Sequence, residues 1–264
     1  MPEKIVGGQK RMRKGIISIT GIALFAAVII CAAGLPAAAG PVSASANLVS
    51  RYIWRGQDLL PSNDMALQPS VTYTLPQGVS LNAWGSFGFG GPNEKDELDE
   101  LDFTASYSGE ISGRLSYTVG HTYYTFHTAG PDESQETFAG VTLTKVEMKP
   151  AIMVYGDWGS DVSRGYYVNI SGSKDFKVML AGEKTMTLGL SAGYCDGQWS
   201  MEPGISDVNF SLSMPLKMKR ITLTPSVNYT YVPDKASSAK GTTSPPKINS
   251  QNELWAGIGI TLNR

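Results

Sequence analysis

The sequence has little cysteine and, beyond its N-terminal region, no long apolar run. Two of its 264 residues are cysteines, Cys31 and Cys195. We expect Cys31 to be removed with a signal peptide, so Cys195 would stand alone in an oxidising compartment and no intramolecular disulfide could form. After residue 46 no segment approaches the ~20 consecutive apolar residues of a membrane-spanning helix. These absences exclude helical membrane spans in that region and a fold held by disulfide bonds.

The sequence also has no excess of positive charge and no cofactor-binding motif. The sequence has 22 Lys and Arg against 23 Asp and Glu. Five of the basic residues and one acidic residue lie in the expected signal peptide, which leaves 17 against 22 and a net charge of −5. A general nucleic-acid binder would show a basic stripe, so no nucleic-acid partner is expected. No metal, nucleotide or phosphate-loop motif is present either, and we expect no cofactor and no metal.

The N-terminal region has the composition of a secretory signal peptide. A basic head precedes an apolar run over 16–35, and an A-x-A site follows that ends at Ala39. This order predicts cleavage by signal peptidase. We expect cleavage after Ala39, with Ala46 as the second choice, so that 1–39 is the signal peptide and 40–264 the mature domain. A retained membrane anchor is the alternative, because the apolar run approaches the length that spans a bilayer.

Apolar and polar residues alternate along most of the mature chain. A period of two is typical of strands with one apolar and one polar face. The clearest segments are 67–75, 79–89, 101–107, 115–119, 208–212, 221–231 and 254–262, and weaker candidates lie near 47–56, 136–145, 150–156, 164–172 and 186–194. The pattern predicts about twelve strands.

The links between these segments alternate strictly between short and long. The short links include 76–78 and 215–220, and the long ones include 57–65 and 232–250. With an even number of strands, both termini fall on the side of the short links, as in bacterial outer-membrane barrels. The sequence therefore predicts an all-β fold, a transmembrane antiparallel up-and-down β-barrel. A soluble β-sandwich is the alternative, but its strands usually stop at about five or six residues.

One segment near the expected mature N-terminus resembles a known family. The segment Ser50–Gly56 reads SRYIWRG and is similar to the opening S-x-Y-x-x-R-G of the TorF-type porins of proteobacteria. Further matches lie at Asn82–Ser86, Glu100–Tyr107 and Glu136–Gly140, and the similarity runs from about residue 43 to the C-terminus. The resemblance implies a barrel in the outer membrane of a Gram-negative bacterium that passes small solutes, in a family whose substrate is generally unassigned.

Charged residues on the polar faces are candidates for lining the barrel interior. Arg51 and Arg55 have the parity opposite to Tyr52 and Trp54, so they face the lumen if the aromatic residues face lipid. Inward placement is favoured because a charge facing lipid near the bilayer centre costs ~2–4 kcal/mol. The pore-lining candidates are Arg51, Arg55, Asp102, Arg114, Glu136, Asp207 and Glu253.

Two interpretations of these charges remain open. They form either a charged constriction that selects solutes or a salt-bridge network that fills a narrow lumen. Barrels of about eight strands are filled by side chains and those of about sixteen enclose a channel, so twelve strands fit both interpretations. If Arg51 and Arg55 line a constriction, replacing both with Ser should shift the selectivity towards cations.

The function expected from these features is passive diffusion of small hydrophilic solutes or ions through an outer-membrane porin, without chemistry. The expected partners are outer-membrane lipid, lipopolysaccharide, the solutes and the barrel-assembly machinery. One alternative is a lipid-modifying enzyme that uses His121 or His127, although no serine motif accompanies either histidine. Another is a structural or adhesive barrel whose loops, such as 232–250, bind a partner. The carboxylate-rich stretch 94–100 either binds a divalent cation or forms a solvated loop.

Overall fold

The computed structural model describes residues 42–60, 65–89, 97–127, 133–159, 164–233 and 252–262. The expected signal peptide lies outside these residues, as do positions 94–96 of the carboxylate-rich stretch and most of the link 232–250. Among the described residues, no helix has the length and apolar character needed to cross a membrane.

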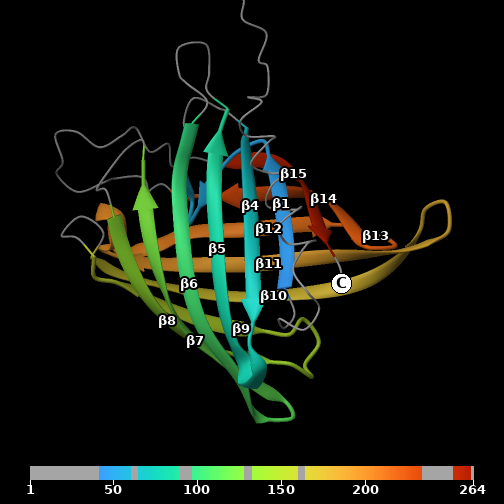
Figure 1. Ribbon diagram of the computed structural model, residues 1–264, viewed down its shortest axis with the longest axis horizontal. Coiled ribbons are helices and arrows are strands. Elements are labelled where there is room, and N and C mark those ends of the chain that lie inside the picture. The colour runs from blue at the N-terminus through green and yellow to red at the C-terminus, as the bar shows by residue number, and fades with distance from the viewer. Residues whose placement is uncertain are drawn as a thin grey trace, which may run out of the picture.

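Strands make up most of the described chain (Figure 1). They are β1 (Val42–Val49), β2 (Ile53–Trp54), β3 (Gln57–Asp58), β4 (Ala66–Thr74), β5 (Val79–Gly88), β6 (Glu97–Ser112), β7 (Leu115–Phe126), β8 (Glu133–Leu143), β9 (Ala151–Asp157), β10 (Gly165–Met179), β11 (Glu183–Asp196), β12 (Gly204–Ser213), β13 (Leu216–Met218), β14 (Ile221–Tyr231) and β15 (Glu253–Leu262). Two single 3-10 turns, η2 (Pro76–Gly78) and η3 (Gln198–Ser200), are the helical elements of the described part.

The long strands close into one antiparallel barrel. Each pairs with its neighbour in sequence from β4 through β12, β12 pairs with β14, and β14, β15, β1 and β4 follow in order and complete the ring. The short β13 continues β12 beyond Pro215 and pairs with the same partner, β14. Counting β12 and β13 as one strand, the described ring has twelve strands. Figure 1 shows β4 and β5 at the front and β10 to β12 passing behind them. The predicted twelve-stranded, all-β barrel is confirmed.

The two faces of the wall have opposite polarity. On β6 and β7, Phe103 lies opposite Tyr123, and both side chains are exposed on the outside. The neighbouring pair is Asp102 and Tyr124, which point inward, and Tyr124 is buried. The period-two alternation of the sequence therefore places apolar side chains outward and polar ones inward.

Large apolar side chains are exposed around the barrel exterior. They include Leu81, Phe103, Val119, Val154, Ile170, Phe210, Val227 and Ile258, which come from eight different strands. An apolar surface that encircles a barrel is the signature of a lipid-facing band. A soluble barrel or sandwich would instead turn this face toward its core.

The connections differ between the two ends of the barrel. The short-turn end carries the turns between β4 and β5, β6 and β7, β8 and β9, β10 and β11, and β13 and β14. The start of β1 and the end of β15 lie at this end too, because Ala44 is opposite Leu262. The other end, here the long-loop end, carries the longer connections. The predicted alternation of short and long links holds around the ring except at the β8–β9 link, whose seven residues (144–150) exceed the six (127–132) between β7 and β8.

The segment after β1 departs from the predicted strand near 47–56. β1 ends at Val49, and β2 and β3 pair only with each other, forming the β2–β3 hairpin. Arg55 and Gly56 form its turn with φ angles of 49° and 80°. Two successive left-handed residues are typical of a tight type I′ hairpin turn.

The β2–β3 hairpin lies inside the barrel at the long-loop end. Tyr52, which precedes it, is buried and donates a hydrogen bond of 2.8 Å to Glu100 on the inner face of β6. Trp54 packs edge-on against Trp199 of η3, with ring centroids 6.1 Å apart. The sequence-based condition, that Tyr52 and Trp54 face lipid, is therefore not met. The parity argument failed because the wall strand stops before these residues and the chain turns into the interior.

Candidate functional site

The centre of the candidate site is Glu136 on the inner face of β8. Glu136 is only 1% exposed. It pairs with Thr122 in the β7–β8 ladder and with Asp157 in the β8–β9 ladder. Gln198 donates a hydrogen bond of 2.7 Å to its Oε2, and Tyr124 donates one of 3.0 Å to its Oε1. The wall strand β7 and the η3 turn thus each supply one donor to this carboxylate.

Arg55 at the tip of the β2–β3 hairpin completes the coordination of Glu136. Its Nη1 lies 2.7 Å from Oε2 and its Nη2 lies 2.9 Å from Oε1, so the ion pair is bidentate. Nη1 also donates to Oε1 of Gln198. The Arg55 side chain is 8% exposed, and a guanidinium stays charged in proteins. Buried, two-pronged pairs of this kind are the strong class of charge-assisted hydrogen bonds.

Aromatic rings enclose the guanidinium of Arg55. Its central carbon lies 4.3 Å from the ring centroid of Trp54, 4.6 Å from that of Tyr155 and 4.3 Å from that of Tyr167. Such contacts are worth about 2 kcal/mol when the cation is desolvated. Tyr155 and Tyr167 come from the neighbouring strands β9 and β10, so the wall supplies both the rings and the carboxylate.

A second buried carboxylate, Asp207 on β12, continues the polar cluster around the wall. Tyr167 donates to both of its oxygens at 3.2 Å, and Ser206 and Asn209 donate at 2.6 Å. Asn209 in turn accepts from Thr230 of β14 at 2.8 Å. The hairpin packs on this region, because a Cβ on Gly56 would lie 2.8 Å from the backbone oxygen of Ser206.

On the side of the barrel opposite Asp207, Tyr52, which precedes the β2–β3 hairpin, contacts β5 and β6. Burial raises the pKa of the Tyr52 phenol well above its ordinary value, so it stays protonated and donates to Glu100. Ser86, which pairs with Glu100 in the β5–β6 ladder, is fully buried, and its hydroxyl has no hydrogen-bond partner among the described residues. One carboxylate oxygen of Asp102 is buried without a hydrogen-bond partner there as well.

The structure brings six of the seven pore-lining candidates to the long-loop end and pairs four of them. Arg55 binds Glu136, and Arg51 Nε lies 3.3 Å from Oε2 of Glu253. Asp102 and Asp207 face the same interior. Arg114 does not join them, because it lies exposed in the turn between β6 and β7 at the short-turn end. That these residues line a conducting path stays a prediction.

Negative charge predominates among the buried groups of this end. The buried carboxylates of the described chain are Asp58, Glu100, Glu136, Asp157, Asp207 and Glu253. Arg51 forms an ion pair with Glu253, and Arg55 forms one with Glu136. Within the described residues, His, Cys, Asp and Glu side chains do not gather in threes that could hold a metal ion.

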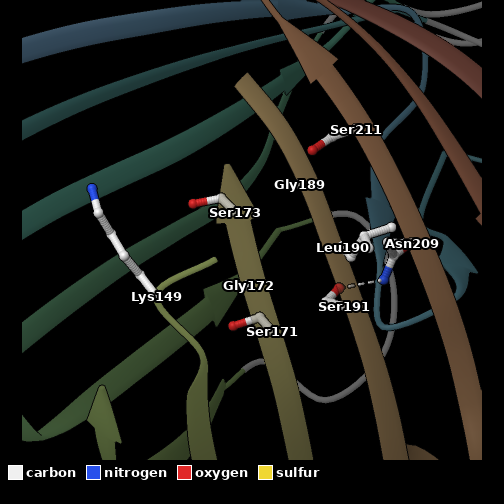
Figure 2. Close-up of a pocket in the computed structure, with 9 residues that line it drawn as sticks. All are labelled: Lys149, Ser171, Gly172, Ser173, Gly189, Leu190, Ser191, Asn209 and Ser211. Atoms are coloured by element: carbon white, nitrogen blue, oxygen red, sulfur yellow. Dashed lines mark hydrogen bonds between the residues drawn. The ribbon is translucent and has the colours of Figure 1, made fainter. Parts of the chain in front are cut away.

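Toward the middle of the barrel the interior is lined by small polar residues. A cavity of about 260 Å³ lies against β10, β11 and β12, with Lys149 at its edge (Figure 2). Figure 2 shows Ser171, Ser173 and Ser211 around it, and Asn209 donates to Ser191 at 3.2 Å. Hydroxyl and amide groups that line a space of this size are suited to water and small hydrophilic solutes.

The sequence missed the wall residues that surround Arg55. Tyr124 has the inward parity of Thr122, which gave a signal, but adjacent aromatic residues at 166 and 167 hid which of them points inward. Gln198 lies in a loop with no periodic pattern at all.

The histidines considered for catalysis lie elsewhere. His121 is on the outer face of β7, where its Nδ1 is 3.1 Å from the Thr137 hydroxyl and its ring packs edge-on against Trp158. His127 is exposed just beyond the end of β7.

Two solved structures with a similar fold are described as porins. The chain matches a structure described as the KdgM porin with a TM-score of 0.54 and 10% identity, over 84% of this chain and 99% of that one. It matches a NanC porin structure with a TM-score of 0.55 and 10% identity, over 85% of this chain and all of that one. At this level of identity the similarity concerns the fold alone.

Sequence comparisons place the chain in a family. No curated protein sequence matches it significantly, and the resemblance to the TorF-type porins stays a prediction. A family model covers residues 35–232, three quarters of the sequence. The chain therefore belongs to the family described as "Bacterial protein of unknown function (Gcw_chp)".

Proposed function

We propose that this protein is a channel in the outer membrane of a Gram-negative bacterium, through which small hydrophilic solutes or ions diffuse passively. The observation that carries the proposal is the opposite polarity of the two faces of a closed barrel. The exterior is apolar around the ring, and the interior is lined by Ser, Thr, Asn and charged residues. Lipid and lipopolysaccharide would contact the exterior, and the barrel-assembly machinery would insert the protein.

The β2–β3 hairpin would set the size limit of this channel. It crosses the interior at the long-loop end from Glu100 on β6 to Ser206 on β12. Solutes must pass beside it, so the two sequence-based interpretations combine: the ion pairs fill part of the lumen and also bound the remaining path. A narrow path of this kind favours small solutes over long chains.

The charge of the interior favours cations. One of the KdgM porin structures with a similar fold, at a TM-score of 0.52 and 9% identity, is described as a complex with oligogalacturonate, which is a polyanion. In the present chain six buried carboxylates lie at the long-loop end, and two of them, Glu136 and Glu253, form ion pairs with Arg55 and Arg51. We therefore propose cations and neutral solutes, rather than acidic sugars, as the permeating class.

Single-channel recording in a planar bilayer tests the proposal. We expect discrete, stable current steps from the purified protein, and a reversal potential in a KCl gradient that has the sign of cation selectivity. The double variant Arg51→Ser/Arg55→Ser should shift the reversal potential further in that direction. A protein that inserts fully, as judged by its heat-modifiable mobility, but carries no current would refute the channel. Unchanged selectivity of the double variant would show that these arginines do not bound the path.

We propose no catalytic role for the barrel. The outward-facing His121 contacts a threonine hydroxyl and a tryptophan ring, and neither contact supplies the acid that would orient the imidazole as a base. Incubation of the protein with phospholipid should release no fatty acid. Release that disappears in a His121→Ala variant would overturn this part of the proposal.

A further inference from the structure

The recess that holds the Arg55 side chain is built largely by the barrel wall. Its carboxylate comes from β8, its two tyrosine rings from β9 and β10, and its amide from Gln198 in η3. Trp54 is the one group around the guanidinium that the hairpin itself supplies. Tyr124 and Gln198 hold the Glu136 carboxylate by hydrogen bonds of their own. The recess therefore keeps its orientation without Arg55, as a preformed binding site does.

The shape and charge of the recess fit a guanidinium group. Glu136 presents both oxygens to two different nitrogens at 2.7 and 2.9 Å, which is the forked arrangement that a planar guanidinium matches and an ammonium does not. Tyr155 and Tyr167 offer their faces at 4.6 and 4.3 Å, and a flat, weakly hydrated cation stacks well on aromatic faces. Gln198 adds one acceptor.

The hairpin that delivers Arg55 has no strand pairing with the wall. β2 and β3 form two residue pairs with each other and belong to no wall sheet, and an isolated two-stranded hairpin is at best marginally stable. Its position depends on side-chain contacts, chiefly those of Arg55, Tyr52 and Trp54. A ligand that replaces Arg55 in the recess would remove the strongest of these contacts.

We propose that the recess of Glu136, Gln198, Tyr155 and Tyr167 is a guanidinium-binding site that Arg55 occupies as an internal ligand, and that solutes carrying a guanidinium group compete for it and release the β2–β3 hairpin. The binding site stands on the geometry alone, whereas the opening of a path on release rests on the proposed channel function. Because Arg55 is tethered beside the site, its effective concentration is high, on the order of millimolar. A free ligand must therefore be more concentrated to act on the wild-type protein than on a protein without Arg55.

Chemical rescue of an Arg55→Ala variant tests the site. This variant leaves Glu136 buried without its cation, and added guanidinium chloride at low millimolar concentration, with ionic strength held constant, should fill the space. The ratio of folded to unfolded protein should rise with guanidinium and reach roughly tenfold when its concentration is about ten times the Kd. Sodium and tetramethylammonium, which cannot form the forked contact, should not produce this rise. If the variant does not refold in sodium salts, its refolding yield in guanidinium is the measurement.

A double variant, Arg55→Ala/Glu136→Gln, is the matched control. It has the same empty space but no carboxylate, so its folding should not respond to guanidinium. An equal response in the double variant, or no response in Arg55→Ala, would overturn the site. Conductance of the wild-type protein tests the second part, because guanidinium should increase the current at higher concentrations than those that rescue Arg55→Ala. Rescue together with a conducting channel that guanidinium leaves unchanged would overturn the release. If guanidinium rescues Arg55→Ala but the wild-type protein carries no current, the guanidinium site is supported and the channel function is refuted.

Discussion

The buried ion pair between Arg55 and Glu136 should dominate the stability of the long-loop end. Replacing Arg55 with Ala leaves a carboxylate that is 1% exposed without its cation, and breaking a buried pair from one side costs about 3–5 kcal/mol of unfolding free energy. Gln198 and Tyr124 still donate to Glu136, so the loss should lie near the lower bound. Replacing Glu136 with Gln strands the guanidinium among Trp54, Tyr155 and Tyr167, and should cost about as much.

The double variant Arg55→Ala/Glu136→Gln should be less destabilised than the sum of the two single variants. Once one charge is gone, removing the other relieves a buried and unpaired group rather than breaking an interaction. Coupling energies of about 1.5–7 kcal/mol are measured for close buried charge pairs. Given the bidentate contact at 2.7 and 2.9 Å, we expect a coupling of at least about 2 kcal/mol.

Equilibrium unfolding in urea, with the protein in detergent or thin bilayers, measures these differences. The pair between Arg51 and Glu253 is the internal control, because Arg51 Nε lies 3.3 Å from Oε2 of Glu253 and the Arg51 side chain is 23% exposed. Its coupling should be about 1 kcal/mol or less. Additive effects at Arg55 and Glu136, with no more coupling than in the control pair, would refute the argument that the hairpin is held by this contact.

Three further predictions follow from the packing. Gly56→Ala would place a Cβ 2.8 Å from a β12 carbonyl oxygen, so it should displace the hairpin and raise single-channel conductance. The control is Gly182→Ala, because Gly182 also has a positive φ but a Cβ there would have no atom within 4 Å. This variant should leave the conductance unchanged. Cys195 is fully buried, so it should resist maleimide in the folded barrel and react after unfolding; rapid labelling of the folded protein would contradict its position. Val227→Arg on the exposed outer face of β14 should cost ~2–4 kcal/mol in a bilayer, and a neutral effect would show that this face does not contact lipid.

The wall of the barrel could be predicted from the sequence because its signal is local. Along β6, Leu101, Phe103 and Tyr107 alternate with polar residues, and the structure gives this segment a continuous ladder with both neighbours. The alternation within each strand shows which of its faces is apolar, and the number of such segments gives the number of strands. Strands with weaker alternation, such as β10 with its adjacent aromatics Tyr166 and Tyr167, were placed less well but counted correctly.

The candidate site could be predicted only in part because its contacts are not local. Tyr52 and Trp54 keep an aromatic residue at every second position beyond the end of β1, so the pattern cannot show that the wall strand ends and a hairpin begins. The usual turn signal is Asn-Gly or Asp-Gly, and here Arg55 takes the first position with a φ of 49°. Glu136, its partner, lies 81 residues away in sequence.

The strained backbone at Arg55 makes sense once the contact that holds it is considered. A left-handed conformation at a residue other than Gly, Asn or Asp costs of order 1–3 kcal/mol, and it persists where the surroundings stabilise it by more than that. Around Arg55 they do so through one carboxylate and three rings. If that contact is lost, the strain favours departure of the hairpin rather than its return. A guanidinium that displaces Arg55 would itself pair with Glu136 and would add one positive charge to the interior, so a barrel opened in this way should be less selective for cations than a closed one.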